Sequence, residues 1–342
     1  MAKTILTTDR IDSLRCYMKK HRLDATILHN EFDILALLGV KCDSANVVVT
    51  ATDLVFYTDF RYATEIRRVE PELTVRDIKR IKLSGKRLGY VSSISKAGFD
   101  RLQKLAPKAT FVDVAEEIQK LRAIKAAWEI EKIRRAQKLN REIWEALEAG
   151  KSCLKGKSEF VMRQGIISLQ SLNDSTEAFS TIASVGANAA ECHHLPDDTV
   201  WDGKSPLLID MGLKYGDFCS DITRMIDPKK PSPAYAKARA LVQEAHDKAI
   251  AAAKPGMTAA ELDKVARDVI VKGGFGKCFG HSLGHGVGFE VHEYPTISKK
   301  NRKCILKPGM VFTIEPGIYL EGNFGIRIED MVLITEDGCE VL

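Results

Sequence analysis

Four acidic residues in the second half of the chain have neighbours that suit a metal site. Asp210, Glu315 and Glu329 each directly follow an apolar, β-branched residue, and Asp221 lies in the run Ser220–Arg224. Carboxylates in such places are expected to be partly buried, which is costly unless they are paired or bind a metal. One of them alone would be read as an ordinary strand-end or turn carboxylate. Four together favour a cluster that holds hard metal ions.

Histidines gather in the same half of the chain. His281, His285 and His292 surround a glycine-rich turn, and His285 itself lies between Gly284 and Gly286. Glycines on both sides of a histidine let a ligand approach the imidazole closely. A lone histidine is usually a core or surface residue, but three around one turn are more informative. Carboxylates with one imidazole suit Mn²⁺, Co²⁺, Zn²⁺ or Fe²⁺.

Several other chemistries are excluded by spacing. Gly150 and Gly156 in front of Lys157 are one residue too far apart for a phosphate-binding loop. Gly284, Gly286 and Gly288 lack the dinucleotide-binding spacing. The chain also has no H-E-x-x-H helix and no G-x-S-x-G elbow.

Composition narrows the class of protein further. Hydrophobic content of 45% and charged content of 28% are ordinary for a globular protein, and the net charge is only +5. Six basic residues fall between Arg76 and Arg87, but with little aromatic interleaving, which predicts a solvated face and no nucleic-acid partner. The eight cysteines form no C-x-x-C pair, and we expect them to be reduced.

The location of the protein is predicted from its apolar runs. The longest, Ile34–Val40, is far shorter than the ~18 residues that a membrane span needs. The start of the chain, Met1–Asp12, is polar and lacks a signal core. We therefore expect a cytoplasmic protein with no membrane partner.

The elements that position these residues fall into two domains. Residues 1–115 alternate helix-like and strand-like stretches, including a predicted hairpin of Asn46–Thr50 and Leu54–Thr58, and indicate a small α/β domain. Residues 116–149 contain no proline or glycine and predict charged helix, with the boundary near residue 122. Helices and then several short strands follow, which favours an α+β domain with a mainly antiparallel sheet. The predicted domains are residues 1–122 and 123–342.

These residues resemble the ligand set of the "pita-bread" metallopeptidases (peptidase family M24), which include methionyl aminopeptidase, aminopeptidase P and prolidase. Two features resemble the proline-peptidase branch: the short interval between Glu315 and Glu329, and Arg327 two residues before Glu329. Two further segments resemble its small creatinase-type first domain and its interdomain helix: Thr58–Tyr62, and Leu121–Lys125 with Glu129-Ile130. The resemblance implies a small α/β domain followed by a pita-bread catalytic domain.

The resemblance also implies roles for single residues. Two divalent metal ions, with Mn²⁺ favoured, would be held by five ligands: Asp210, Asp221, His285, Glu315 and Glu329. Glu315 would also move a proton, His292 would stabilise the oxyanion, and His193 would contact substrate. His281, Arg327 and Tyr319 would form the substrate-binding group, in which His281 and Arg327 line the proline side and Tyr319 supports the site from behind. Cys192 departs from the family pattern, which usually has proline there, and His194 has no family role.

The implied activity is removal of an N-terminal residue that precedes proline, by a homodimer acting on short peptides. We expect an Xaa-Pro aminopeptidase, with Xaa-Pro dipeptidase (prolidase) as the alternative, because the first half shows no long insertion that could act as a lid. A non-catalytic peptide- or protein-binding module is a remote alternative, since it predicts lost ligands and all five are present. Methionyl aminopeptidase is disfavoured by Thr58–Tyr62 and by Arg327.

Overall fold

The computed structural model describes residues 8–342, and these form two compact units. One unit runs to Arg122 and the other from Ala123 to Leu342. Residues 1–7, part of the polar start from which the location was predicted, lie outside the described residues. Within residues 8–342, no helix has both the length and the apolar character needed to cross a membrane.

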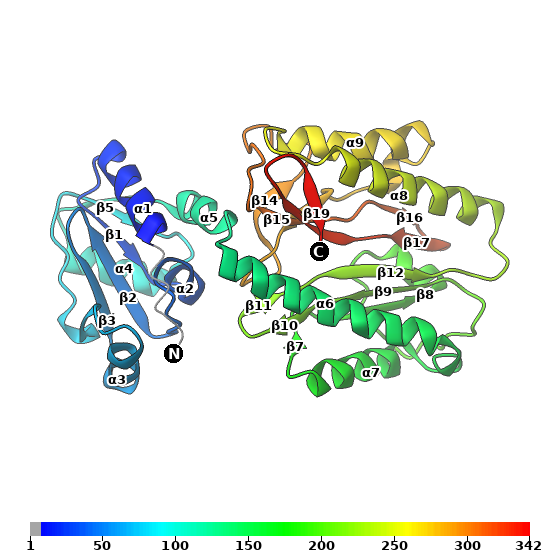
Figure 1. Cartoon of the computed structure of the whole chain (residues 1–342), viewed down its shortest axis with the longest axis horizontal. Helices are drawn as coiled ribbons and strands as arrows, with labels where there is room; N and C mark the ends of the chain where they lie inside the picture. Colours follow the sequence, from blue (N-terminus) through cyan, green and yellow to red (C-terminus); the bar gives the residue numbers. More distant parts are fainter. Residues whose placement is uncertain (1–7) are drawn as a thin grey trace. The chain divides into compact units, whose positions relative to one another are not determined.

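The first unit is built on a mixed six-stranded sheet (Figure 1). Its order is β4-β3-β2-β1-β5-β6, in which β1, β2 and β3 pair antiparallel and the outer pairs are parallel. The predicted hairpin is confirmed as β2 and β3. The strands are β1 (Ala25–Leu28), β2 (Ala45–Thr50), β3 (Leu54–Thr58), β4 (Thr74–Asp77), β5 (Arg87–Tyr90) and β6 (Thr110–Asp113).

The first helix of this unit buries one apolar face. In the first helix, Ile11, Leu14 and Met18 are all buried, as their spacing predicts. The helices are α1 (Thr8–His21), α2 (Glu31–Leu38), α3 (Phe60–Val69), α4 (Lys96–Leu105) and α5 (Ala115–Ala123), with a short η1 (Ile78–Arg80). The six basic residues between Arg76 and Arg87 are exposed to solvent.

The charged helical run does not form one helix. It is interrupted between α5 and α6 (Ala127–Ala149), where Ile124 forms a β-bridge with Met310 and Lys125 donates its N–H to the Gly309 carbonyl. Pairing with another segment outweighs local helix propensity there. In α6, Ile133, Ala136, Ile143 and Leu147 are buried, and Gly150 follows the last residue of the helix.

In the second unit, two pairs of helices cover strands that lie between them (Figure 1). A five-stranded sheet, β14-β13-β15-β18-β19, shares a core with α8 and α9, and a three-stranded sheet, β12-β9-β8, shares one with α6 and α7. All strand pairs described in this unit are antiparallel, as predicted. The helices are α7 (Glu159–Leu172), α8 (Pro233–Ala252) and α9 (Ala259–Lys272), with η2 (Lys151–Cys153), η3 (Gly186–Ala190) and η4 (Gly276–Cys278).

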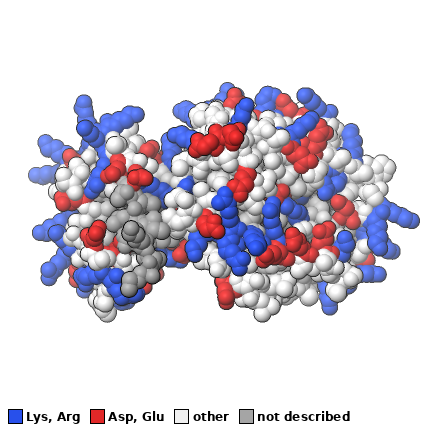
Figure 2. Space-filling view, viewed as in Figure 1, with Lys and Arg blue, Asp and Glu red and all other residues white. Residues whose placement is uncertain are grey.

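The strands of this unit are short, from two to five residues each, and the predicted acids lie within or next to several of them. The strands are β7 (Thr176–Glu177), β8 (Ile182–Val185), β9 (Leu207–Met211), β10 (Leu213–Tyr215), β11 (Phe218–Cys219), β12 (Ile222–Ile226), β13 (Gly284–Gly286), β14 (Glu293–Ile297), β15 (Val311–Ile314), β16 (Gly317–Leu320), β17 (Phe324–Arg327), β18 (Asp330–Ile334) and β19 (Cys339–Val341). On the face drawn in Figure 2, acidic and basic side chains are interspersed over this unit.

Candidate functional site

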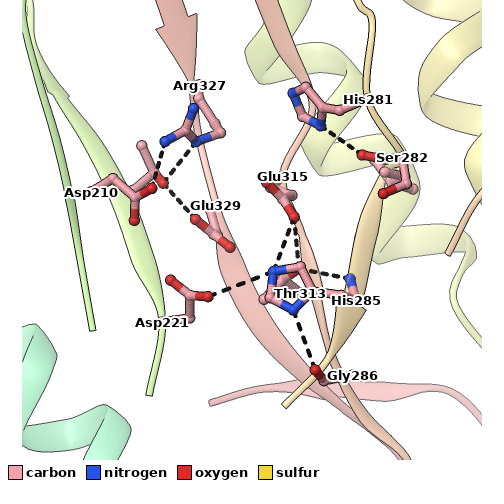
Figure 3. A network of polar contacts seen from close by, with 12 residues as sticks. Asp210, Asp221, His281, Ser282, His285, Gly286, Thr313, Glu315, Arg327 and Glu329 are labelled. Atoms are coloured by element: carbon pink, nitrogen blue, oxygen red, sulfur yellow. Dashed lines mark hydrogen bonds and ion pairs between the residues drawn. The ribbon is translucent and has the colours of Figure 1, made fainter. Parts of the chain in front are cut away.

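The four predicted acids lie within or next to strands of the second unit, and Figure 3 shows their side chains gathered at one place. Asp210 lies within β9, and Asp221 immediately precedes its partner strand β12. Glu315 follows β15, and Glu329 stands between β17 and β18. Asp210, Asp221 and Glu329 are buried, and the Glu315 side chain is only 14% exposed. The prediction that these acids are at least partly buried is confirmed.

The backbone around two of these acids is fixed by buried hydrogen bonds. The Gln137 side chain of α6 donates to the Asp221 carbonyl and accepts from the Asp221 N–H. The Glu329 N–H donates to the Thr223 carbonyl, and the Thr223 hydroxyl donates to Glu329 Oε2 at 2.5 Å. The Asp221 backbone and the Glu329 carboxylate are therefore held in place before any ligand binds.

Burial and mutual repulsion disfavour the charged form of these acids. The pKa of Asp221 is raised well above its usual value, by burial first and then by Glu329 and Asp210. Burial, with Glu315 and Asp210, likewise raises the pKa of Glu329. For Glu315, burial raises the pKa to about 8 in spite of the opposing charge of Arg327. A cation placed among these groups would relieve that repulsion.

His285 of β13 points its Nε2 atom at the acids. This atom lies 3.3 Å from Glu315 Oε1 and 3.7 Å from Asp221 Oδ2 (Figure 3). Its other ring nitrogen, Nδ1, is 3.2 Å from the Gly286 carbonyl, which can only accept, so Nδ1 carries the hydrogen. Burial, followed by the charge of His292, lowers the pKa of His285 to about 4. The neutral ring thus presents a lone pair to carboxylate oxygens.

Thr313 joins His285 to Glu315. Its hydroxyl accepts from the His285 N–H at 3.1 Å and donates to Glu315 Oε1 at 3.2 Å. The structure does not support the suggestion that Gly284 lets a ligand approach His285. A Cβ atom there would lie 1.8 Å from the Thr313 carbonyl oxygen, so the glycine is needed for strand packing rather than for ligand approach.

Arg327 is buried, and its guanidinium is engaged by protein groups. It donates to Asp210 Oδ2 at 2.5 Å, to the Thr223 hydroxyl at 3.1 Å and to the Tyr319 hydroxyl at 2.9 Å. A longer contact of 3.5 Å reaches the Cys192 carbonyl. These contacts orient Asp210 directly and Glu329 through Thr223. The predicted contact between Arg327 and the proline side of a substrate stays a prediction.

His281 and Tyr319 form a directed chain with Arg327. His281 Nδ1 donates to the Ser282 carbonyl at 2.7 Å, and Nε2 lies 2.9 Å from the Tyr319 hydroxyl. Burial, followed by the charge of Arg327, lowers the pKa of His281 to about 4, so the ring is neutral and its Nε2 accepts from Tyr319. Burial raises the pKa of Tyr319, which keeps this hydroxyl protonated.

His292 and His193 are the exposed histidines of the predicted site. The His292 ring stacks edge-on against His285, with ring centroids 4.2 Å apart. Burial and then the charge of His193 lower the pKa of His292. The next residue, Glu293, is fixed by a buried ion pair of 2.7 Å with Lys125, whose side chain is 2% exposed. The exposed His292 side chain therefore belongs to a segment that the Lys125–Glu293 ion pair holds in place.

The donor set fits a divalent metal ion. Asp221, His285 and Glu329 each offer one ligand atom, and these atoms lie within 4.8 Å of one another. Asp210 Oδ1 is buried and has no hydrogen-bond partner among the residues described. Several anionic oxygens and one imidazole lone pair converge without enough donors to satisfy them, which is the environment that a hard or borderline cation needs.

Comparison with known proteins decides the family. Residues 131–336 match metallopeptidase family M24, and residues 10–124 match the creatinase/prolidase N-terminal domain. The chain belongs to metallopeptidase family M24. It is therefore a hydrolase that depends on a divalent metal ion, and its fold is the predicted N-terminal domain followed by a pita-bread domain. The remote alternative of a non-catalytic module is not supported.

Relatives and solved structures of this family span nearly the whole chain. An Xaa-Pro dipeptidase of Pyrococcus horikoshii is 33% identical over 98% of this chain and 97% of its own, and one of Pyrococcus furiosus matches equally well. A prolidase structure from P. horikoshii has a TM-score of 0.90 at 31% identity, covering 97% of each chain. An X-Pro aminopeptidase structure from Thermotoga maritima has a TM-score of 0.81 at 30% identity, covering 94% of this chain and 97% of that one.

Sequence reasoning missed three groups that support the site. Thr223 links Arg327 to Glu329, and its position two residues after Asp221 along a strand would have placed both on one face. Lys125 is buried against Glu293, although it was noted only as part of a family segment. His194, to which the resemblance assigned no role, is buried, and its Nε2 atom lies 2.8 Å from Glu159 Oε2.

Proposed function

We propose that this chain hydrolyses the bond between an N-terminal residue and a following proline, as an Xaa-Pro dipeptidase. The observation that carries the proposal is the near full-length similarity to the two Pyrococcus enzymes of that name. It favours the dipeptidase alternative over the aminopeptidase that the absence of a lid suggested. The catalytic unit would be residues 123–342, preceded by the domain of residues 1–122.

The metal ligands we propose are the five residues predicted from the sequence: Asp210, Asp221, His285, Glu315 and Glu329. Two divalent ions, with Mn²⁺ favoured, would balance the four carboxylates. When bound, such ions polarise a peptide carbonyl and make water a nucleophile near neutral pH. Arg327 holds Asp210, and Thr223 holds Glu329, so neither carboxylate has to reorient when the ions bind.

Proton transfer would fall to Glu315. Its Oε1 atom accepts from Thr313 on one side and faces His285 on the other, which fixes its direction. We propose that Glu315 takes a proton from the attacking water and returns it to the proline nitrogen as the bond breaks. The leaving nitrogen needs this proton because proline would otherwise depart as a strongly basic nitrogen anion.

Stabilisation of the oxyanion would fall to His292. The side chain is exposed beside His285, and Lys125 anchors the residue that follows it. A hydrogen bond aimed at the developing negative charge is worth more in a partly dry site than in water. His193, whose charge also acts on His292, would contact the substrate.

A second candidate is Xaa-Pro aminopeptidase. The Thermotoga structure of that name is 30% identical to this chain, and the Arg327 guanidinium is largely engaged, whereas a dipeptidase needs a cation for the terminal proline carboxylate. Purified protein loaded with Mn²⁺ should be assayed side by side on Gly-Pro and Arg-Pro-Pro. Cleavage of the dipeptide alone supports the dipeptidase. Cleavage of the tripeptide at an equal or higher rate would move the proposal to the aminopeptidase.

The family resemblance also suggests a cytoplasmic homodimer that acts on short peptides with proline at the second position and binds no nucleic acid. Light scattering on a size-exclusion column should give twice the mass of the chain, about 76 kDa from 38.0 kDa per copy. A monomer mass at the concentration of the activity assay would contradict the dimer.

A further inference from the structure

Glu159 is a fully buried acid outside the metal cluster that binds four separate groups. It is the first residue of α7 and is 0% exposed. Its Oε1 atom accepts from the Val185 N–H at 2.6 Å and from the Asn188 amide at 3.0 Å. Its Oε2 atom accepts from the Asp197 N–H at 3.2 Å and pairs with His194 Nε2 at 2.8 Å.

The four partners of Glu159 lie on both sides of one loop. Val185 ends β8 and Asn188 lies in η3, before the loop residues 191–193, whereas His194 and Asp197 come after them. One carboxylate therefore ties the two ends of the segment together. Between those ends stands His193, which is exposed.

The same loop rests on the strand that leads to the metal cluster. A Cβ atom at Gly325 of β17 would lie 1.7 Å from the Ala189 carbonyl oxygen, so η3 packs directly against the β17 backbone. Two residues further on, Arg327 of β17 reaches the Cys192 carbonyl at 3.5 Å. The position of His193 relative to the site therefore depends on how the loop is held.

We propose that Glu159 and His194 form a clamp that positions His193 against the substrate. The inference rests on the proposed function, because it takes His193 to be a substrate contact. Neither clamp residue need touch the substrate. They act through the loop, and they are positioning residues.

The charges of the clamp suit this purpose. The His194 ring faces Glu159 on one side and Glu191 on the other, at 3.3 Å, with Asp197 Oδ2 at 4.0 Å. Because both ring nitrogens face carboxylates, this geometry favours the protonated ring. Burial opposes this, but the hydrogen bonds to Glu159 and Glu191 outweigh it and raise the pKa of His194.

A metal ion is the rival explanation for this cluster. Glu159, His194 and Asp197 each offer a ligand atom within 4.8 Å of the others. Both oxygens of Glu159 already accept N–H donors, however, so the carboxylate is satisfied without a cation. The clamp thus predicts that loss of His194 leaves the metal content of the protein unchanged.

A double-mutant cycle with His193 tests the clamp. Hydrolysis of Gly-Pro should be measured for Mn²⁺-loaded wild type, H194F, H193A and the H193A/H194F double variant. We expect H194F to lower kcat/KM about tenfold in the wild-type background and less than about twofold in H193A, because the clamp acts through His193. E191Q is the comparison, because Glu191 touches the same ring but is 75% exposed and ties neither end of the loop; it should lower kcat/KM by less than about twofold.

Several outcomes overturn the clamp. An equal loss from H194F in both backgrounds would mean a general structural effect, and loss of one metal ion per chain would mean a metal site. If H194F does not fold, H194Q serves in the same cycle. A wild type inactive on Xaa-Pro substrates, or H193A with full activity, would instead refute the proposed function or the role of His193.

A second measurement is independent of activity. Hydrogen–deuterium exchange of metal-loaded wild type, E159Q and E191Q should be compared over residues 186–197. We expect faster exchange there in E159Q and no change in E191Q. Unchanged exchange in a folded E159Q would overturn the clamp whatever the substrate of the enzyme is.

Discussion

Replacement of Arg327 by methionine separates two roles for this residue. The guanidinium contacts Asp210, Thr223 and Tyr319 at 2.5, 3.1 and 2.9 Å, and all of these partners stay behind in R327M. Removing one member of a buried ion pair costs about 3–5 kcal/mol of stability. Loss of a group that orients a metal ligand typically costs about 10–100-fold in activity or metal affinity. We expect both effects.

The assay compares a dipeptide with its amide. If Arg327 orients Asp210, R327M should lower kcat for Gly-Pro and for Gly-Pro-amide by the same factor. If Arg327 instead binds the proline carboxylate, R327M should raise KM for the free acid alone, by the factor of about 10–150 that a charged hydrogen bond supplies. A selective loss on the acid would refute the positioning role and restore the substrate contact that the sequence suggested.

Two further variants test whether the expected loss is specific to the Arg327 guanidinium. R163M is the control, because the Arg163–Glu177 pair of 2.8 Å lies in the same unit and is partly exposed, and its loss should leave kcat unchanged. R327K keeps the charge but not the planar fork, so it should fold better than R327M and still lose kcat.

Three other predictions test separate parts of the site. D221N should lose activity and bind less metal, because one anionic ligand of the proposed cluster is gone, and wild-type metal content and rate would contradict this. H292A should lower kcat by about 10²–10³ with metal content unchanged, as for loss of an oxyanion donor, whereas a change in KM alone would argue against that role. The pKa of His194 is raised above 6.5 in the folded chain, so its pair with Glu159 stabilises the fold fully below pH 6.5. This stabilisation is lost as the pH rises through the raised pKa. The difference in Tm between wild type and H194F should therefore shrink with increasing pH.

Much of the fold follows from local patterns. The hairpin of β2 and β3 and the exposed run of basic residues between Arg76 and Arg87 both match their predictions. Each of these depends on residues close together in the chain. The break between α5 and α6 could not be predicted in that way, because it depends on pairing of Ile124 with Met310, which is far away in sequence.

The site residues also divide into those that local sequence reveals and those that depend on partners far away in the chain. Residues with chemistry of their own were found from their types and flanking apolar residues, and the fold places Asp221, His285 and Glu329 together. The groups that orient them were not found, because Thr223 and Glu159 look ordinary until their partners are known. Sequence indicated which side chains could react, whereas the long-range hydrogen bonds that fix their directions became visible only in the folded chain.

The central claim is that the cluster of Asp210, Asp221, His285, Glu315 and Glu329 holds the divalent ions that make this chain a proline-specific peptidase. The most direct test is to strip the wild-type protein with a chelator and titrate it with Mn²⁺ while bound metal and Gly-Pro hydrolysis are measured together. We expect no hydrolysis in the stripped protein and a rate that rises with occupancy until two ions are bound per chain. Undiminished hydrolysis in protein shown to be metal-free would contradict the claim.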